Sequence, residues 1–171
     1  MAYVQKSTAQ DWPVIKRIIE TSFEIFGEDE PQNITKLAKQ LLNLPEADDA
    51  ISLIATMQGQ TCGYILLFPT HHEGQLYYIL SLIGVLPAFQ KKAVGSHLIQ
   101  SAINDLPKEC VGIFVLGDEY YTRFGFKPCK DYNLVQPFPN SENDQYFLMR
   151  QGFVKPDVPT IISYPAPFHA A

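Results

Sequence analysis

The chain has 171 residues, of which 46% are hydrophobic and 18% charged, and its formal net charge is −5. This length suits one ordinary globular domain, so we predict a single domain over residues 1–171 with a proline-rich C-terminal extension at 154–171. The apolar content excludes a disordered chain, and the acidic balance argues against nucleic acid as a partner, because such proteins normally carry a basic face.

The first half of the chain predicts one strand, two helices and a β-hairpin. Apolar residues at three- and four-residue spacing predict the helices, and the cap residues Thr8 and Asp11 start the first of them. The turn Gln58-Gly59 between two runs of β-forming residues predicts the hairpin. In chain order we expect a strand at Tyr3–Lys6, a helix ending at Gly27, a helix at 33–44, and strands at Ile51–Met57 and 61–69.

The second half predicts a strand, a helix and a strand, followed by irregular β structure. The run 76–86 is too long and too rich in β-branched and aromatic residues for a loop, 90–105 has helical spacing, and 111–116 is fully apolar. A strand–helix–strand crossover makes its two strands parallel. Beyond it we expect a short helix at 119–124, strand starts at Phe126 and 146–149, and a tail that closes one side of the sheet or forms an interface.

Cysteine usage and hydropathy favour a cytoplasmic protein. Cys62, Cys110 and Cys129 are an odd number without a C-x-x-C pair, which predicts free thiols, no disulfide framework and no metal. The first residues lack the layout of a signal peptide, and no apolar run reaches the ~20 residues that span a bilayer. We therefore expect no membrane partner.

The segment that joins the run 76–86 to the next helix carries the clearest chemical signal. A strand that passes through a short loop of small residues into a helix N-terminus directs backbone N–H groups outward, where they bind phosphate. Lys91 and Lys92 would add attraction for a diphosphate. The alternative is a close contact between helix and strand that requires the small residues Ala93 and Gly95. The segment is not a P-loop, since no Gly-Lys-Ser/Thr follows.

Two motifs in this order resemble the GNAT superfamily of N-acetyltransferases. Val85-Leu86-Pro87, Gln90 and Gly95 match the family's strand end and the Gln/Arg-x-x-Gly-x-Gly/Ala loop that binds acetyl-coenzyme A. Tyr121, four residues before Gly125-Phe126, matches the second motif. The sequence Val115-Leu116-Gly117-Asp118, followed by Tyr120-Tyr121, is most similar to a bacterial subgroup of predicted N-acetyltransferases. The resemblance implies an α+β fold with a central, twisted, mostly antiparallel sheet, one parallel pair and flanking helices.

One position departs from the family pattern. Ala93 stands where the family has its first loop glycine. An alanine with negative φ costs little there, whereas positive φ strains it by about 1 kcal/mol or more. The conformation of Ala93 therefore decides how well this loop suits coenzyme A.

The resemblance also implies an activity and a set of site residues. It implies transfer of the acetyl group of acetyl-coenzyme A to a primary amine by direct attack, with no metal. Tyr121, rather than its neighbour Tyr120, would protonate the leaving thiolate. Backbone groups of Ile83 and Val85 would bond the pantetheine arm and the thioester oxygen. The residues implied in cofactor binding are Ile83, Gly84, Val85, Gln90, Lys91, Lys92, Ala93, Val94, Gly95 and Ser96.

Neither the base nor the acceptor follows from a motif. Glu28, Asp29, Glu30 and Glu73 are candidate bases, although solvated loop charges are the commoner role of such residues, and water could serve instead. His71-His72 suggests a metal pair, but neighbouring strand residues face opposite ways and no third ligand lies at useful spacing.

The acceptor would be a small molecule or a peptide, and a homodimer is an open possibility. A non-catalytic module that binds acyl-coenzyme A or regulates a partner is the alternative function, and a fold relic that serves protein interaction is a third.

Overall fold

A computed structural model describes residues 2–138 and 144–169. The described chain forms two compact units. The first contains Met1–Phe68 and Ser81–Leu106, and the second contains Pro69–Leu80 and Pro107–Ala170. This division into two compact units does not decide the number of domains. The single domain expected from the chain length therefore stays a prediction.

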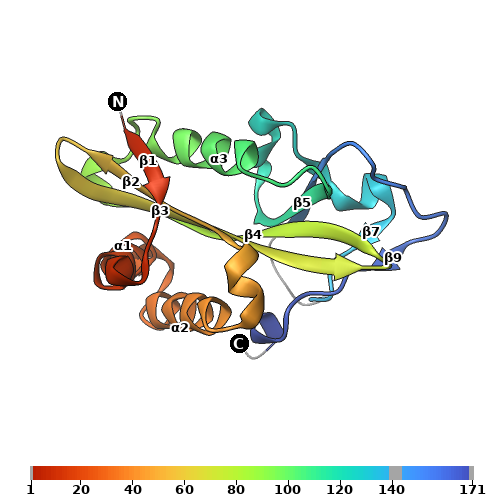
Figure 1. The fold of residues 1–171 in the computed structure, drawn as a ribbon, viewed down its shortest axis with the longest axis horizontal. Coiled ribbons are helices and arrows are strands. Elements are labelled where there is room, and N and C mark those ends of the chain that lie inside the picture. Colours follow the sequence, from red (N-terminus) through yellow and green to blue (C-terminus); the bar gives the residue numbers. More distant parts are fainter. Residues whose placement is uncertain (1, 139–143, 170–171) are drawn as a thin grey trace. The chain divides into compact units, whose positions relative to one another are not determined.

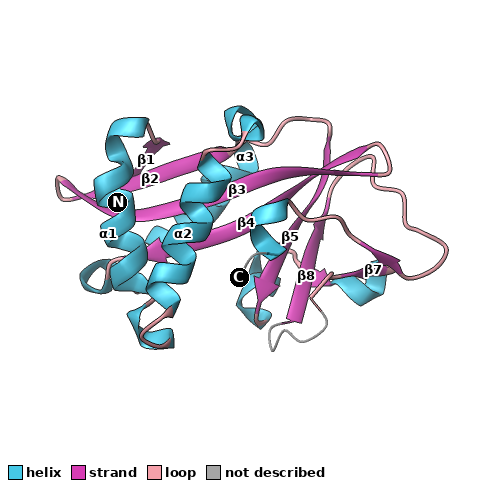
Figure 2. Cartoon of the chain, turned by 90° about the horizontal axis from the view of Figure 1, so that it is seen from below, coloured by secondary structure: helices cyan, strands magenta, loops and turns pink. Residues whose placement is uncertain are grey.

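The first unit combines the N-terminal strands with all three α-helices. Its elements are β1 (Tyr3–Lys6), α1 (Trp12–Ser22), α2 (Glu30–Leu42), β2 (Ile51–Met57), most of β3 (Gln60–His72), the end of β4 (Gln75–Val85) and α3 (Val94–Asn104). β1 pairs antiparallel with β2, and β2 with β3. Helices α1 and α2 cover one face of these strands and α3 covers the other (Figures 1 and 2). The helices and the hairpin expected here are confirmed.

Local sequence explains the ends of these elements. The carboxylate of Asp11 accepts a hydrogen bond from the backbone N–H of Thr8 at 2.7 Å, which forms the capping box of a 3-10 helix, η1 (Ala9–Asp11), that leads directly into α1. Gln58 and Gly59 both have positive φ, at 54° and 76°, the geometry of a two-residue hairpin turn of type I′. Gly63 lies under α3, because a Cβ there would be 3.0 Å from Cδ1 of Leu98.

The second unit contains the start of β4 and the C-terminal strands. Its further elements are β5 (Cys110–Gly117), β6 (Lys127–Pro128), β7 (Leu134–Val135), β8 (Asp144–Met149), β9 (Thr160–Ile161) and the 3-10 helices η5 (Glu119–Phe124) and η6 (Cys129–Tyr132). β4 and β5 are parallel, with Leu76 opposite Cys110 and Leu80 opposite Val115. β8 pairs antiparallel with both β5 and β6. The crossover and its parallel pair are therefore confirmed.

The proline-rich tail contributes to the core of the second unit. Ile162 and Tyr164 are buried there with Phe114, Phe147 and Cys129. β9 pairs in parallel with β7, so the tail forms a second, two-stranded sheet. Thr70 Oγ1 donates a hydrogen bond to the carbonyl oxygen of Ser163 at 2.8 Å, which fastens the tail to β3.

The hydrogen-bonded strand order is β1-β2-β3-β4-β5-β8-β6. The described residues thus form a mixed sheet, mostly antiparallel with one parallel pair and flanked by helices, as expected. Several boundaries differ from expectation. α1 ends at Ser22 instead of Gly27, and α2 spans Glu30–Leu42 instead of 33–44. α3 begins at Val94 instead of residue 90, because Lys91 and Ala93 have positive φ and cannot continue a helix. β3 runs past Pro69 to His72, three residues beyond the expected end.

Candidate functional site

The end of β4 is held in place by two side chains that donate to one carbonyl. The carbonyl oxygen of Val85 accepts a hydrogen bond from Ser22 Oγ at 3.2 Å and another from Gln90 Nε2 at 3.0 Å. These bonds use both lone pairs of that oxygen. A ligand that bonds the backbone of Val85 would therefore meet its N–H, which is a donor suited to polarise a carbonyl.

Ser22 was not among the residues expected from sequence. It reaches β4 because Gly84 carries no side chain: a Cβ there would lie 2.9 Å from Ser22 Oγ. Ser22 is the last residue of α1, so the end of the helix rests on the end of the strand. Gly84 is the sequence signal for this close approach, because its missing side chain makes room for Ser22.

The loop between β4 and α3 turns sharply at two residues. Lys91 has φ 61° and Ala93 has φ 65°, both in the left-handed region. Ala93 is the residue before α3, and the N–H of His97 closes the first helical turn on the carbonyl oxygen of Ala93 at 3.0 Å. Val94, Gly95 and Ser96 form that first turn. The N–H groups of a first helical turn have no carbonyl partner within the helix. The chain therefore passes from β4 into α3 through two left-handed residues.

The loop is exposed and carries positive charge. Lys91, Lys92 and Ala93 are all exposed. The ammonium group of Lys92 lies 5.8 Å from the ring centroid of the buried Phe89, a cation–π contact that keeps this charge beside the loop. The positive end of the α3 dipole and two lysines together favour a phosphate-bearing ligand.

Two backbone conformations of Ala93 were considered from sequence, with negative and with positive φ. The structure has the strained one, with positive φ. We expect Ala93→Gly to raise the free energy of unfolding by up to about 1 kcal/mol, since relief of the positive-φ cost exceeds the added entropy of the unfolded chain. Ala88→Gly is the matched control, because Ala88 is equally exposed and does not have positive φ. That control should lose about 0.5–1 kcal/mol. Equal losses for both variants in urea titrations would contradict strain at Ala93.

Tyr121 belongs to the second unit, in the 3-10 helix η5. Asp118 caps this helix by accepting a hydrogen bond from the N–H of Tyr120 at 2.9 Å. The Tyr121 ring lies over the backbone of Gly117, where a Cβ would be 2.6 Å from its Cε2. Burial, with smaller contributions from Tyr120 and Asp118, raises the pKa of Tyr121 to about 12. The phenol is therefore protonated throughout the physiological range.

The remaining residues considered from sequence are acidic residues that are exposed or half-buried, a histidine in a side-chain contact, and buried cysteines. Glu28 and Asp29 are exposed, Glu30 is half-buried at the start of α2, and the side chain of Glu73 is 74% exposed in the turn between β3 and β4. A base among these four stays a prediction. His72 Nδ1 lies 3.3 Å from Ser163 Oγ in a structural contact. The three cysteines are free and buried, and burial raises the pKa of each thiol.

The side chains of residues 2–138 and 144–169 form no metal centre. No group of three or more His, Cys, Asp or Glu side chains is arranged to hold a metal ion among these residues. Within the same part of the chain, every helix is too short or too polar to cross a bilayer.

Comparison with known proteins gives a family. Residues 48–128 match the model of the acetyltransferase (GNAT) domain, a range that contains the β4–α3 loop and Tyr121. The uncharacterized N-acetyltransferase YjhQ of Escherichia coli K12 is 35% identical over 122 residues, which cover 67% of this chain and 67% of YjhQ.

Solved structures agree in fold. The GNAT family N-acetyltransferase YhbS from Escherichia coli, in complex with CoA, has a TM-score of 0.81 and 22% identity, covering 98% of this chain and 92% of its own. A GNAT family acetyltransferase from Brucella melitensis, in complex with acetyl-CoA, has a TM-score of 0.70 and 26% identity, covering 98% of both chains. With these likenesses and both motifs present, the chain belongs to the GNAT family of N-acetyltransferases.

Proposed function

We propose that this protein transfers the acetyl group of acetyl-coenzyme A to a primary amine. The β4–α3 loop carries the proposal, because its left-handed turns at Lys91 and Ala93 and the following first turn of α3 present backbone N–H groups and two lysines to an anion. The Brucella melitensis protein, which is 26% identical and binds acetyl-CoA, supports the same cosubstrate here. Residues 90–96 would hold the diphosphate of coenzyme A.

The reaction is a direct attack on the thioester. The amine nitrogen forms a bond to the carbonyl carbon, the carbon–sulfur bond breaks, and the ammonium proton is lost as coenzyme A leaves. Backbone groups of Ile83 and Val85 would bind the pantetheine arm and the thioester oxygen. The N–H of Val85 would be the donor to the developing oxyanion, at a strand end that Ser22 and Gln90 hold through the Val85 carbonyl.

Tyr121 would act on the leaving sulfur. Its pKa of about 12 lies about 3.5 units above that of a thiol near 8.5. Complete proton transfer from the phenol to the thiolate would therefore cost about 5 kcal/mol. The phenol is therefore best used as a hydrogen-bond donor to the sulfur while negative charge develops, with the net proton supplied by the acceptor's ammonium group. The base stays unassigned, and water is the simplest candidate.

The cellular setting and the assembly remain predictions from sequence. The acidic net charge of −5 is compatible with a cationic amine acceptor, and free buried thiols are compatible with the cytoplasm. A homodimer would be tested by light scattering of the purified chain.

Calorimetric titration with acetyl-coenzyme A, followed by an assay of thiol release with a panel of amines, tests the proposal. We expect micromolar binding by the wild type, within about threefold of Ala93→Gly, and amine-dependent release of coenzyme A. Binding without release for any amine would favour a non-catalytic module. Binding by Ala93→Gly alone would mean that the methyl group closes the loop.

A further inference from the structure

The last residue of α1 supplies a hydroxyl that serves β4 and not its own helix. A serine in a helix commonly donates its proton to the carbonyl four residues earlier. Ser22 Oγ donates instead to the carbonyl oxygen of Val85, 63 positions away in the chain, at 3.2 Å. A hydroxyl has a single proton, so this bond takes the whole donor capacity of Ser22.

Gly84 allows this contact between the helix and the strand. A Cβ at Gly84 would lie 2.9 Å from Oγ and 3.1 Å from Cβ of Ser22, and 3.5 Å from Cγ2 of Ile18. Ser22 is half-buried, and both partners of the contact belong to the first unit. The end of α1 therefore packs closely on β4 and holds the Ser22 hydroxyl beside the Val85 carbonyl.

Three hydrogen bonds hold the peptide group between Val85 and Leu86. Its carbonyl oxygen accepts from Ser22 Oγ and, at 3.0 Å, from Gln90 Nε2. Its N–H, which belongs to Leu86, donates to the carbonyl oxygen of Cys62 in β3 at 2.8 Å. The N–H and C=O of a trans peptide point in opposite directions, so the Val85 carbonyl points away from β3. Ser22 thus holds the side of this peptide that β3 does not hold.

The N–H of Val85 lies on the same edge of β4 as this carbonyl. An extended residue directs its own N–H and C=O to the same side of its strand, and Val85 is the last residue of β4. Among the described residues, the pairing of β4 with β5 ends at Leu80. At Val85 this edge therefore has no β5 partner, and its N–H is the donor that the proposed function gives to the thioester oxygen.

A carbonyl oxygen without donors on that edge would oppose the reaction. The developing oxyanion and a carbonyl oxygen are both negative, and two such oxygens close together repel each other. Donors to the carbonyl offset part of its charge and keep the peptide group from turning, so that the N–H is already in position when the oxyanion forms. Gln90 reaches the carbonyl from a loop, whereas Ser22 reaches it from a packed helix.

We propose that Ser22 is a positioning residue for acetyl transfer: its hydrogen bond to the Val85 carbonyl keeps the Val85 N–H directed at the thioester oxygen and weakens a competing negative charge. Ser22 acts through Val85 and touches no reacting atom. This inference rests on the proposed acetyltransferase function.

The carbonyl of bound acetyl-coenzyme A reports this role without any acceptor. A hydrogen bond to a carbonyl oxygen weakens the C=O bond, so its stretching frequency should fall when the wild type binds acetyl-coenzyme A labelled with ¹³C at the acetyl carbonyl. We expect Ser22→Ala to lose most of this fall in isotope-edited infrared spectra. The Kd for acetyl-coenzyme A should stay within about threefold, because most of the cofactor's contacts are unchanged.

Turnover gives a second readout, with the fastest amine of the panel described above. We expect kcat to fall about 10-fold in Ser22→Ala at unchanged KM for acetyl-coenzyme A, since a small misplacement of a reacting group can cost up to about 100-fold. Ser22→Thr keeps the hydroxyl and should restore both the carbonyl frequency and kcat. Thr21→Ala removes a hydroxyl from the same turn of α1 and should change neither.

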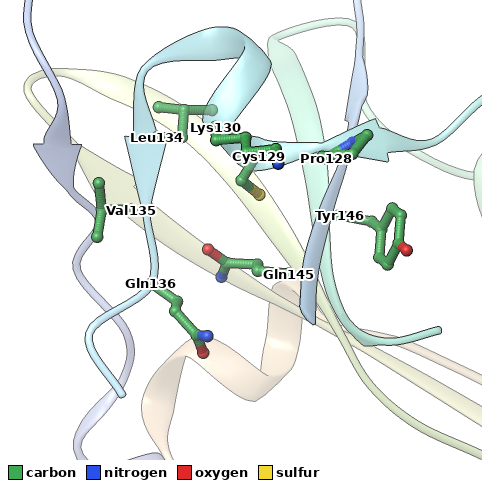
Figure 3. A pocket seen from close by; sticks show the side chains of 8 residues that line it. All are labelled: Pro128, Cys129, Lys130, Leu134, Val135, Gln136, Gln145 and Tyr146. Carbon is green, nitrogen blue, oxygen red and sulfur yellow. The ribbon is translucent and has the colours of Figure 1, made fainter. Parts of the chain in front are cut away.

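A second control separates positioning from stability. Leu134 is buried in the second unit, where it lines a cavity of about 290 Å³ (Figure 3). We expect Leu134→Val to lower the urea midpoint, because it removes buried apolar contacts, and to leave the carbonyl frequency and kcat at their wild-type values. Equal changes in Leu134→Val and Ser22→Ala would assign the effect to folding and overturn the positioning role.

The remaining outcomes distinguish this inference from the proposed function. A wild-type carbonyl frequency in Ser22→Ala, or no fall in frequency when the wild type binds acetyl-coenzyme A, would overturn the role of Ser22. Absence of product from every amine would overturn the proposed function, whereas the infrared comparison needs only bound acetyl-coenzyme A. If the wild type does not bind acetyl-coenzyme A, the proposed function and this inference are both wrong.

Discussion

Replacing Tyr121 by Phe is expected to lower kcat about 100-fold and to leave the Kd for acetyl-coenzyme A unchanged. The change removes one hydroxyl from a ring that packs on Gly117 and contacts Phe126 at 5.8 Å between centroids, so the packing is kept. The hydrogen bond that this hydroxyl donates forms in the transition state, in which negative charge develops on the sulfur. Its loss therefore lowers kcat and leaves the binding of acetyl-coenzyme A unchanged. Removing one hydrogen-bond donor that is directed at developing negative charge typically costs about 10²–10³-fold in kcat.

Steady-state kinetics with calorimetry of acetyl-coenzyme A measure the two effects separately. Tyr120→Phe is the matched control, because Tyr120 is the adjacent residue in the same 3-10 helix and should change kcat less than threefold. Wild-type turnover in Tyr121→Phe would remove this residue from the mechanism. A loss in Tyr120→Phe instead would transfer the role to its neighbour.

The pH dependence gives an independent check on Tyr121. Because its pKa is raised to about 12, the donor form is fully present up to about pH 11 and is lost only above that. Any fall in kcat between pH 8 and 10 therefore comes from another group and should persist in Tyr121→Phe. A basic limb near pH 9 that vanishes in this variant would show that the Tyr121 phenol ionises far below its expected pKa.

Replacing Gly112 by Ala is expected to lower the free energy of unfolding by at least about 3 kcal/mol. A Cβ at this position would lie 2.1 Å from Cε1 and Cζ of Phe147, which is fully buried. The Phe147 ring is itself held by Phe114 at 4.9 Å and Tyr132 at 5.2 Å between centroids. Overpacking commonly costs 1–3 kcal/mol, and here no flexible chain end can yield.

Urea unfolding followed by circular dichroism measures this effect, with Gly63→Ala as the control. The nearest neighbour of a Cβ at Gly63 is Cδ1 of Leu98 at 3.0 Å, the mobile end of a side chain, so a loss of about 1 kcal/mol is expected. Adding Phe147→Leu to Gly112→Ala should recover part of the stability. A Gly112→Ala protein within 0.5 kcal/mol of the wild type, about the scatter of surface substitutions, would show that the ring moves freely.

The regular elements followed from sequence where apolar spacing governs structure. The bounds of β1 and β2 agree with expectation to the residue, and the parallel pair followed from the order strand, helix, strand. The start of α3 did not follow from sequence, because nothing in the side chains of Lys91 or Ala93 indicates positive φ.

The site was only partly predictable for a similar reason. Short motifs predict roles for the loop and Tyr121, whereas Ser22 carries no local pattern. Ser22 becomes relevant through the missing side chain of Gly84, 62 positions away in the chain.

The burial of Ile162 and Tyr164 has a consequence for the order of events during synthesis. Every segment of the first unit up to Phe68 and from Ser81 to Leu106 is made before the second unit begins to complete its core. The second unit needs the tail residues against Phe114 and Phe147, so it folds only once they have left the ribosome. Until then β5 and its aromatic side chains are uncovered, which makes slow translation of residues 118–160 the period of greatest exposure to aggregation and to chaperones.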